Sequence, residues 1–198
     1  MAEIRQLEPR REKYEAAKVA FLEAVRKVRL PTVQKSTFNP DGTIKIHRRG
    51  SVIGAVGRST HFGVGARPYH GYIIHKTNAK YPELFEACVA IGNSCVPIGF
   101  KYSTITLNYN VMAKKHIDSK NVGNSIIVGI GTYTDGGLYV YDKTGTTREL
   151  FEIQDKPTMF NGAILPHETQ EYTGERYTLI FYNQPTGLSV EGVEMVGC

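Results

Sequence analysis

With 198 residues and 41% hydrophobic content, the chain is long enough for one domain with its own core and short for two. No stretch reaches the apolar length of a bilayer span, and the first 30 residues are too charged for a secretory signal, so we expect a soluble intracellular protein, cytoplasmic or nuclear. Cys88, Cys95 and Cys198 have neither a zinc-type spacing nor a paired framework, which predicts reduced thiols.

The net charge of +5 is concentrated at the N-terminal end. Residues 1–50 carry twelve Lys/Arg against six Asp/Glu, whereas the remaining 148 residues carry twelve against thirteen. A basic region joined to a nearly neutral body is typical of a protein that attracts a polyanion such as nucleic acid. The alternative is a solvated helix face with a flexible arm, and charge alone does not separate the two.

Two helices are expected ahead of the main run of strands. Residues 10–29, within a basic N-terminal segment 1–35, form an amphipathic pattern that Pro31 ends. Its apolar positions recur at spacings of three and four: Tyr14, Ala17, Phe21, Val25 and Val28. Residues 81–91 form a second pattern, and Pro82 suits its first helical position. Both helices should pack on the outside of a sheet.

A glycine-rich segment, residues 50–75, separates the two helices. It carries six glycines interleaved with aromatic and basic residues, but at spacings that match neither a P-loop nor a Rossmann fingerprint. Rings that stack on a base and guanidinium groups that reach phosphates suit a substrate-covering loop, for which Arg58, His61 and Arg67 are the expected contacts. The alternative is a surface loop whose aromatic side chains pack on the core.

From residue 98 onward the pattern changes to period two, which predicts strands up to residue 183. Residues 100–111 alternate apolar positions with a polar row that would face a cavity, formed by Thr104, Thr106, Asn108 and Asn110. Further strands are expected over residues 125–132, 138–142, 147–153 and 176–182, with turns at the glycines between them.

Two distant segments carry the chemistry. His116 and Asp118 stand two residues apart, so they point the same way along a strand, and His167 follows much later. Two imidazoles and a carboxylate can hold one face of an octahedral Fe(II) and leave three positions open. Arg176, nine residues after His167, has the planar guanidinium that binds a carboxylate with two parallel hydrogen bonds. A lone His-x-Asp pair is a weak signal, so the flanking residues matter.

Those flanking residues are Asn108-Tyr109-Asn110, Asn121-Val-Gly-Asn-Ser125 and Gly136-Gly-Leu-Tyr-Val140. With them, residues 55–183 resemble the Fe(II)/2-oxoglutarate-dependent dioxygenases, in their TET/JBP-like, AlkB-related branch. The resemblance implies a mainly β fold with flanking helices: a double-stranded β-helix (jelly-roll, cupin-like) core over residues 98–183, supported by N-terminal helices. It also implies that the metal ligands sit on opposite sheets.

The resemblance assigns roles to individual residues. His116, Asp118 and His167 would be the catalytic metal ligands, with Fe(II), the cosubstrate 2-oxoglutarate and O2 as reaction partners. Arg176, helped by Thr178 on the same strand face, would bind the remote carboxylate of 2-oxoglutarate. AlkB-like relatives place an asparagine against 2-oxoglutarate, which nominates Asn108 and Asn110. Two tyrosines, Tyr133 and Tyr182, are expected either to pack or to line the pocket.

Two activities remain open for such a site. The first is oxidation of the methyl group of a pyrimidine base in nucleic acid, a form of DNA modification, and the second is prolyl-type hydroxylation of a protein or peptide. Tyr182 stands where AlkB-like sequences have a second pocket arginine, which disfavours direct alkylation repair. A third, non-enzymatic interpretation is a β-sandwich binding module whose histidines are incidental.

Overall fold

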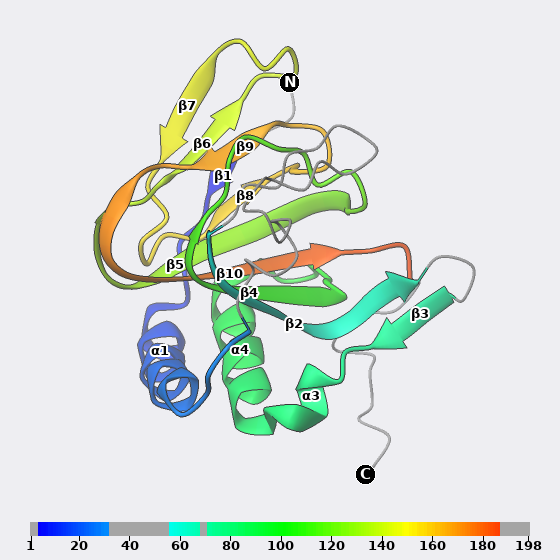
Figure 1. Cartoon of the computed structure of the whole chain (residues 1–198), viewed down its shortest axis with the longest axis vertical. Helices are drawn as coiled ribbons and strands as arrows, with labels where there is room; N and C mark the ends of the chain where they lie inside the picture. The colour runs from blue at the N-terminus through cyan, green and yellow to red at the C-terminus, as the bar shows by residue number, and fades with distance from the viewer. Residues whose placement is uncertain (1–3, 32–55, 68–70, 187–198) are drawn as a thin grey trace, which may run out of the picture.

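The computed structural model describes residues 4–31, 56–67 and 71–186 (Figure 1). The elements in chain order are β1 (Arg5–Gln6), α1 (Arg11–Arg26), β2 (Val56–Arg67), β3 (Gly71–Ile74), α3 (Thr77–Lys80), α4 (Pro82–Cys95), β4 (Thr104–Met112), β5 (Val122–Asp135), β6 (Leu138–Tyr141), β7 (Arg148–Phe151), β8 (Thr158–Phe160), β9 (His167–Thr169) and β10 (Tyr172–Asn183). Over these ranges, no helix combines the length and apolar character that crossing a membrane requires.

Two antiparallel sheets form the body of the protein. The large sheet has seven strands in the order β1-β8-β5-β10-β4-β2-β3, and the small sheet has three in the order β7-β6-β9. The last strand of the chain, β10, returns to pair between β5 and β4. A late strand inserted between earlier ones, with a second sheet facing the first, is the arrangement of a jelly roll. The predicted double-stranded β-helix is therefore confirmed.

Side chains alternate across β10 and divide the core into two parts. Tyr177, Leu179 and Phe181 belong to a core shared with α1 and α4, and we call this side of the large sheet the helix face. Ile180 packs on a second core that includes Leu138 of the small sheet, and we call this opposite side the interior face. Figure 1 shows the helices on one side of the large sheet and β6, β7 and β9 on the other.

The two supporting helices are close to those expected from periodicity. The buried stripe of α1 contains Tyr14, Ala17, Phe21 and Val25, as predicted. The helix ends at Arg26, three residues early, because the N–H groups of the next two residues bond to carbonyls three residues back and tighten the last turn. The second helix, α4, runs four residues past its predicted end at residue 91.

The predicted loop over residues 50–75 is wrong for the residues that the structure describes. Strands β2 and β3 pair with each other there, and β2 pairs with β4 in the large sheet. The glycines that suggested a loop permit close backbone approach instead: Gly57 has φ +127°, and a Cβ on it would lie 2.3 Å from the Asn110 carbonyl oxygen. Phe62 and Val64, fully buried in β2, supply the strand's apolar anchor.

One glycine of the β5–β10 pairing allows a direct test of the fold. Gly131 has φ +134°, and a Cβ there would meet the Glu175 carbonyl oxygen at 2.2 Å. Gly131→Ala should therefore lower the free energy of unfolding by about 3 kcal/mol or more, through backbone strain and overpacking. Gly123→Ala is the matched control, because its φ is +72° but the space around it is open, so a loss of about 1 kcal/mol is expected. Urea denaturation measures both, and equal losses would contradict this account of Gly131.

Candidate metal centre and cosubstrate pocket

The three predicted ligands come together in space. His116 Nε2 lies 3.7 Å from Asp118 Oδ1, and His167 Nε2 lies 3.6 Å from Asp118 Oδ2. The potential ligand atoms of all three residues lie within 4.8 Å of one another. These gaps exceed a hydrogen bond and leave room for an ion, since neighbouring ligands about 2.1 Å from a metal are about 3 Å apart at right angles. The set fits a metal held on one face.

Backbone pairing brings these ligands together. His116 and His167 form an antiparallel bridge in which each backbone N–H donates to the other's carbonyl, at 3.0 and 2.9 Å. The Asp118 N–H donates to the Gly162 carbonyl at 2.9 Å. The prediction that the ligands sit on opposite sheets is therefore wrong: His116 is a direct neighbour of the first residue of β9. Spacing along the chain does not reveal such a non-local bridge.

Both imidazoles turn the same nitrogen toward the centre. His116 Nδ1 lies 2.6 Å from the Lys114 carbonyl oxygen, and His167 Nδ1 lies 3.0 Å from the Leu165 carbonyl oxygen. A carbonyl only accepts, so each Nδ1 carries the hydrogen and each Nε2 keeps a lone pair for a metal. A Cβ on Gly162 would lie 3.1 Å from the Phe160 ring and 3.2 Å from the His167 ring, so a side chain there would crowd both rings.

The charges of the cluster suit metal binding. Burial, followed by the nearby His167, lowers the pKa of His116, although Asp118 opposes this shift. Burial alone would raise the pKa of Asp118, but the close approach of His167, followed by that of His116, outweighs burial and lowers that pKa. A neutral imidazole and an ionised carboxylate are the forms that bind metals. The side chains of Asp118 and His116 are 38% and 28% exposed, so the centre is open to solvent on one side.

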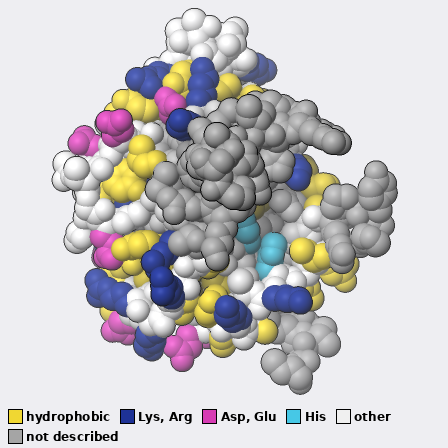
Figure 2. Space-filling view, in the orientation of Figure 1, with side chains coloured by type: hydrophobic (Ala, Val, Ile, Leu, Met, Phe, Trp, Pro, Cys, Tyr) yellow, Lys and Arg dark blue, Asp and Glu magenta, His cyan; other side chains and the backbone are white. Residues whose placement is uncertain are grey.

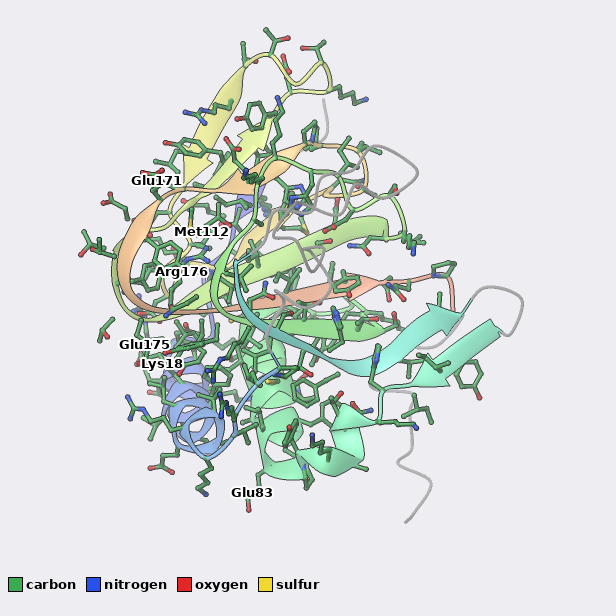
Figure 3. All side chains as sticks on the ribbon, viewed as in Figure 1. Lys18, Glu83, Met112, Glu171, Glu175 and Arg176 are labelled. Carbon is green, nitrogen blue, oxygen red and sulfur yellow. The ribbon has the colours of Figure 1, made fainter. Side chains whose placement is uncertain are left out.

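Arg176 lies in the interior with its charge unpaired. The residue is 3% exposed, its Nε donates to the Gly136 carbonyl oxygen at 3.0 Å, and its guanidinium carbon lies 5.6 and 5.1 Å from the ring centres of Tyr133 and Tyr172. No carboxylate in the described part of the chain forms an ion pair with it. Figure 3 shows Arg176 turned away from α1, to which its neighbour Glu175 is closer. A buried cation without a counter-ion indicates a site for an anionic ligand.

Other polar groups surround this guanidinium. Thr178, 2% exposed, accepts a hydrogen bond from Asn108 Nδ2 at 3.3 Å, so both predicted residues lie on the interior face beside Arg176. Asn110 uses its Oδ1 to accept the backbone N–H of Arg176 at 2.8 Å, which holds the strand that carries the arginine. Within the described ranges, the buried hydroxyl of Tyr133 makes no hydrogen bond of good geometry, although it lies close to the Arg176 guanidinium.

The sequence left open whether Tyr133 packs or lines the pocket, and the structure places it beside Arg176. Burial raises its pKa to about 12, so the phenol stays protonated and can donate. The signal is the pairing of Arg176 with Gly131, which puts Tyr133, two residues along β5, on the same face. Asn121 had no role predicted beyond the resemblance of its segment, and its Nδ2 approaches Asp118 Oδ2 at 3.4 Å.

The three predicted substrate contacts are not brought together. His61 stands opposite Thr106 on the interior face, and Figure 2 shows histidine side chains reaching the surface in this view. Arg58 stands opposite Tyr109, whose ring packs against Tyr177 of the helix-face core, so alternation places Arg58 on that side. The Arg67 side chain lies outside the described residues.

The part of the basic N-terminal region that forms α1 also lies on the helix face. Helix α1 packs there beside α4, with Phe21 against Tyr177 of β10. The large sheet therefore separates the exposed cations of α1 from the metal ligands. Lys114, Lys115 and Lys120, which flank the ligands in sequence, are exposed cations on the same segment as the centre.

Neither the protein-family models nor the curated proteins give a match to this sequence. Solved structures do match it. The chain is similar to NgTET1 in complex with 5mC DNA (12% identity, TM-score 0.45, covering 65% of this chain and 62% of that one). It is also similar to OsALKBH1 (11%, 0.49, 92% and 98%) and to a Pseudomonas putida prolyl-4-hydroxylase (13%, 0.47, 93% and 94%). The chain thus spans less than two thirds of the NgTET1 chain. What it shares with these proteins is the fold.

Proposed function

We propose that the protein is an Fe(II)- and 2-oxoglutarate-dependent dioxygenase that hydroxylates a C–H bond. The observation that carries the proposal is the combination of an open His116, Asp118 and His167 cluster with a buried, unpaired Arg176 on the same interior side of the large sheet. A three-residue ligand set with open positions suits iron that must also hold a cosubstrate and oxygen. A binding module with incidental histidines has no need for such an arginine.

Each residue of the proposed site has a distinct role. His116 and His167 would bind Fe(II) through Nε2 and Asp118 through a carboxylate oxygen. The chemistry that iron supplies when bound is the activation of dioxygen, with 2-oxoglutarate converted to succinate and carbon dioxide and one oxygen atom delivered to the substrate. Arg176 would hold the remote carboxylate of 2-oxoglutarate, and Tyr133 would donate its hydroxyl to the same group.

For the substrate we favour a pyrimidine methyl group in nucleic acid. Supporting this choice, Lys114 and Lys120 are exposed, flank the ligands in sequence and make no ion pair within the described ranges. Exposed cations close to the centre in sequence suit a polyanion. The base would have to leave a duplex to reach the centre, so single-stranded substrate should react at least as readily.

A peptide hydroxylase is the second candidate, and one observation favours it. Strand β3 is the edge of the large sheet, and Tyr72, Ile73 and Ile74 on it are exposed. An exposed apolar edge strand can pair with an extended peptide. The matched structures include both a DNA complex and a prolyl hydroxylase, so they do not choose between these substrates.

Succinate production in the presence of oligonucleotides and peptides tests the function, and salt-dependent binding tests the substrate class. Lys114→Glu with Lys120→Glu should weaken binding of a DNA oligonucleotide and reduce the log-log salt slope by up to ~1.8 on duplex, about 0.9 for each phosphate that is no longer neutralised. Lys13→Glu with Arg29→Glu, exposed cations near the two ends of the α1 region, is the matched control with the same change in net charge. Fluorescence anisotropy at several salt concentrations measures both.

Deletion of residues 1–30 is unsuitable for this test, because Tyr14 and Phe21 are fully buried and their loss would expose the core. If the two double variants weakened DNA binding equally, the cause would be a general electrostatic attraction and not a binding site at Lys114 and Lys120. Succinate production stimulated by a peptide and by no oligonucleotide would move the assignment to the peptide hydroxylase.

A further inference from the structure

Three polar side chains form a continuous hydrogen-bonded line across the interior face. His61 Nδ1 of β2 lies 2.9 Å from Thr106 Oγ1 of β4, and Thr106 Oγ1 lies 3.1 Å from the Tyr182 hydroxyl of β10. His61 is exposed, whereas Tyr182 is 7% exposed. The line therefore leads from solvent into the buried space between the sheets.

This line is separate from the predicted cosubstrate pocket. Along β10 the interior face presents Arg176, Thr178, Ile180 and Tyr182 in turn, at steps of about 6.6 Å. Ile180 packs on the core between the sheets and divides the polar residues into two groups. We call Arg176 and Thr178 the Arg176 group, and Tyr182 with its partners Thr106 and His61 the Tyr182 group. The Arg176 group carries the positive charge that a dicarboxylate needs. The Tyr182 group is the one that reaches solvent, through His61.

The Tyr182 hydroxyl lies within electrostatic reach of one of the proposed metal ligands, Asp118. Burial, and after it the negative charge of Asp118, raises the pKa of Tyr182 to about 12, while the Thr106 hydrogen bond opposes this shift. The phenol therefore keeps its proton at neutral pH. Although His61 reaches the surface, desolvation of its ring by the surrounding protein lowers its pKa, so at neutral pH the ring is uncharged and carries a single N–H.

A single N–H on His61 sets the direction of the whole line. If Nδ1 carries it, His61 donates to Thr106, Thr106 donates to Tyr182, and the Tyr182 O–H is free to donate to a ligand. If Nε2 carries it, each bond reverses and the Tyr182 oxygen is free to accept. In both cases the group offered to a ligand is uncharged. A phosphate or carboxylate would call for a cation here, whereas the edge of a nucleobase matches a hydroxyl that donates or accepts.

We propose that the Tyr182 hydroxyl, oriented by Thr106 and His61, is a positioning group that binds the hydrogen-bonding edge of the substrate base and so places the target carbon at the metal centre. This inference rests on the proposed function. His75 supports the outer end of the line, because its ring lies 5.7 Å from that of His61, at a tilt of 30°.

The test compares substrate oxidation with 2-oxoglutarate consumption, using single-stranded DNA with one 5-methylcytosine. Tyr182→Phe keeps the ring and loses the hydroxyl, and Thr106→Val keeps the shape and breaks the line. Both variants should form succinate while the yield of oxidised base per succinate falls about fivefold or more, as expected for the loss of one hydrogen bond. The KM for 2-oxoglutarate should stay within about twofold of the wild-type value, because each hydroxyl lies outside the Arg176 group. Thr106→Ser, which keeps the hydroxyl, should restore the yield.

A second readout needs neither metal nor turnover. The ¹⁵N shifts of the His61 imidazole, measured by NMR on metal-free protein, should change in Thr106→Val and return in Thr106→Ser. Wild-type yields in both Tyr182→Phe and Thr106→Val would overturn the positioning role, and so would a Thr106→Ser variant as poor as Thr106→Val, which would indicate packing. A lowered yield seen only with a proline-containing peptide would overturn the assignment to a base. Wild-type protein that forms no succinate with any probe would instead overturn the proposed function itself.

Discussion

His116→Ala is expected to abolish Fe(II) binding and, with it, succinate production. The substitution removes one of three ligands whose atoms lie within 4.8 Å of one another, and the remaining pair is too few to hold the ion against water. Loss of even an outer-shell partner typically costs 10- to 100-fold in metal affinity, so removal of a ligand should cost at least ~100-fold. Iron content after anaerobic loading and gel filtration measures the effect.

His61→Ala is the matched control for this experiment. It also removes an imidazole from the interior face, but it leaves His116, Asp118 and His167 in place, so iron content should stay at the wild-type level. Thermal unfolding without metal should show that His116→Ala still folds, since the bridge between residues 116 and 167 uses backbone groups alone. If purified His116→Ala kept full Fe(II) affinity, the ligand assignment would be wrong.

The fold and the grouping of His116, Asp118 and His167 could be predicted because their signals are local or carried by a motif. The stripe of α1 follows from a spacing of three and four, and the strands after residue 98 follow from alternation. His116 and Asp118 share a two-residue spacing that any extended segment turns to one side. The bridge from His116 to His167 joins residues far apart in the chain, and no local rule predicts it.

Other features required the strand register. Glycines in β2 suggested a loop, but Gly57 is needed because the backbone of Asn110 on a neighbouring strand leaves no space for a Cβ. The basic N-terminal region suggested a substrate handle, but charge does not say which face of a sheet a helix covers. Tyr133 joins Arg176 only because Gly131 is the residue opposite that arginine. In each case the deciding partner is distant in sequence.

Arg176→Lys should raise the concentration of 2-oxoglutarate needed for turnover by tenfold or more while leaving Fe(II) affinity within about twofold of wild type. Lysine keeps the charge but lacks the planar fork that binds a carboxylate through two hydrogen bonds. A hydrogen bond to a charged group contributes on the order of 1.5 to 3 kcal/mol, and about 1.4 kcal/mol is a factor of ten. Arg26→Lys, at an exposed arginine of α1, is the matched control and should leave the requirement unchanged.

The thermal stability of an Arg176 variant distinguishes an arginine that binds a ligand from one that only stabilises the fold. Arg176 is 3% exposed and has no carboxylate partner within the described ranges, so its burial should cost the free protein stability. Arg176→Met should therefore match or exceed the wild-type Tm without 2-oxoglutarate. Added 2-oxoglutarate with a redox-inactive divalent metal should raise the Tm of the wild type more than that of the variant, because a ligand stabilises only the state that binds it. A large loss of Tm in Arg176→Met, or unchanged 2-oxoglutarate affinity in Arg176→Ala, would show that another group holds the cosubstrate.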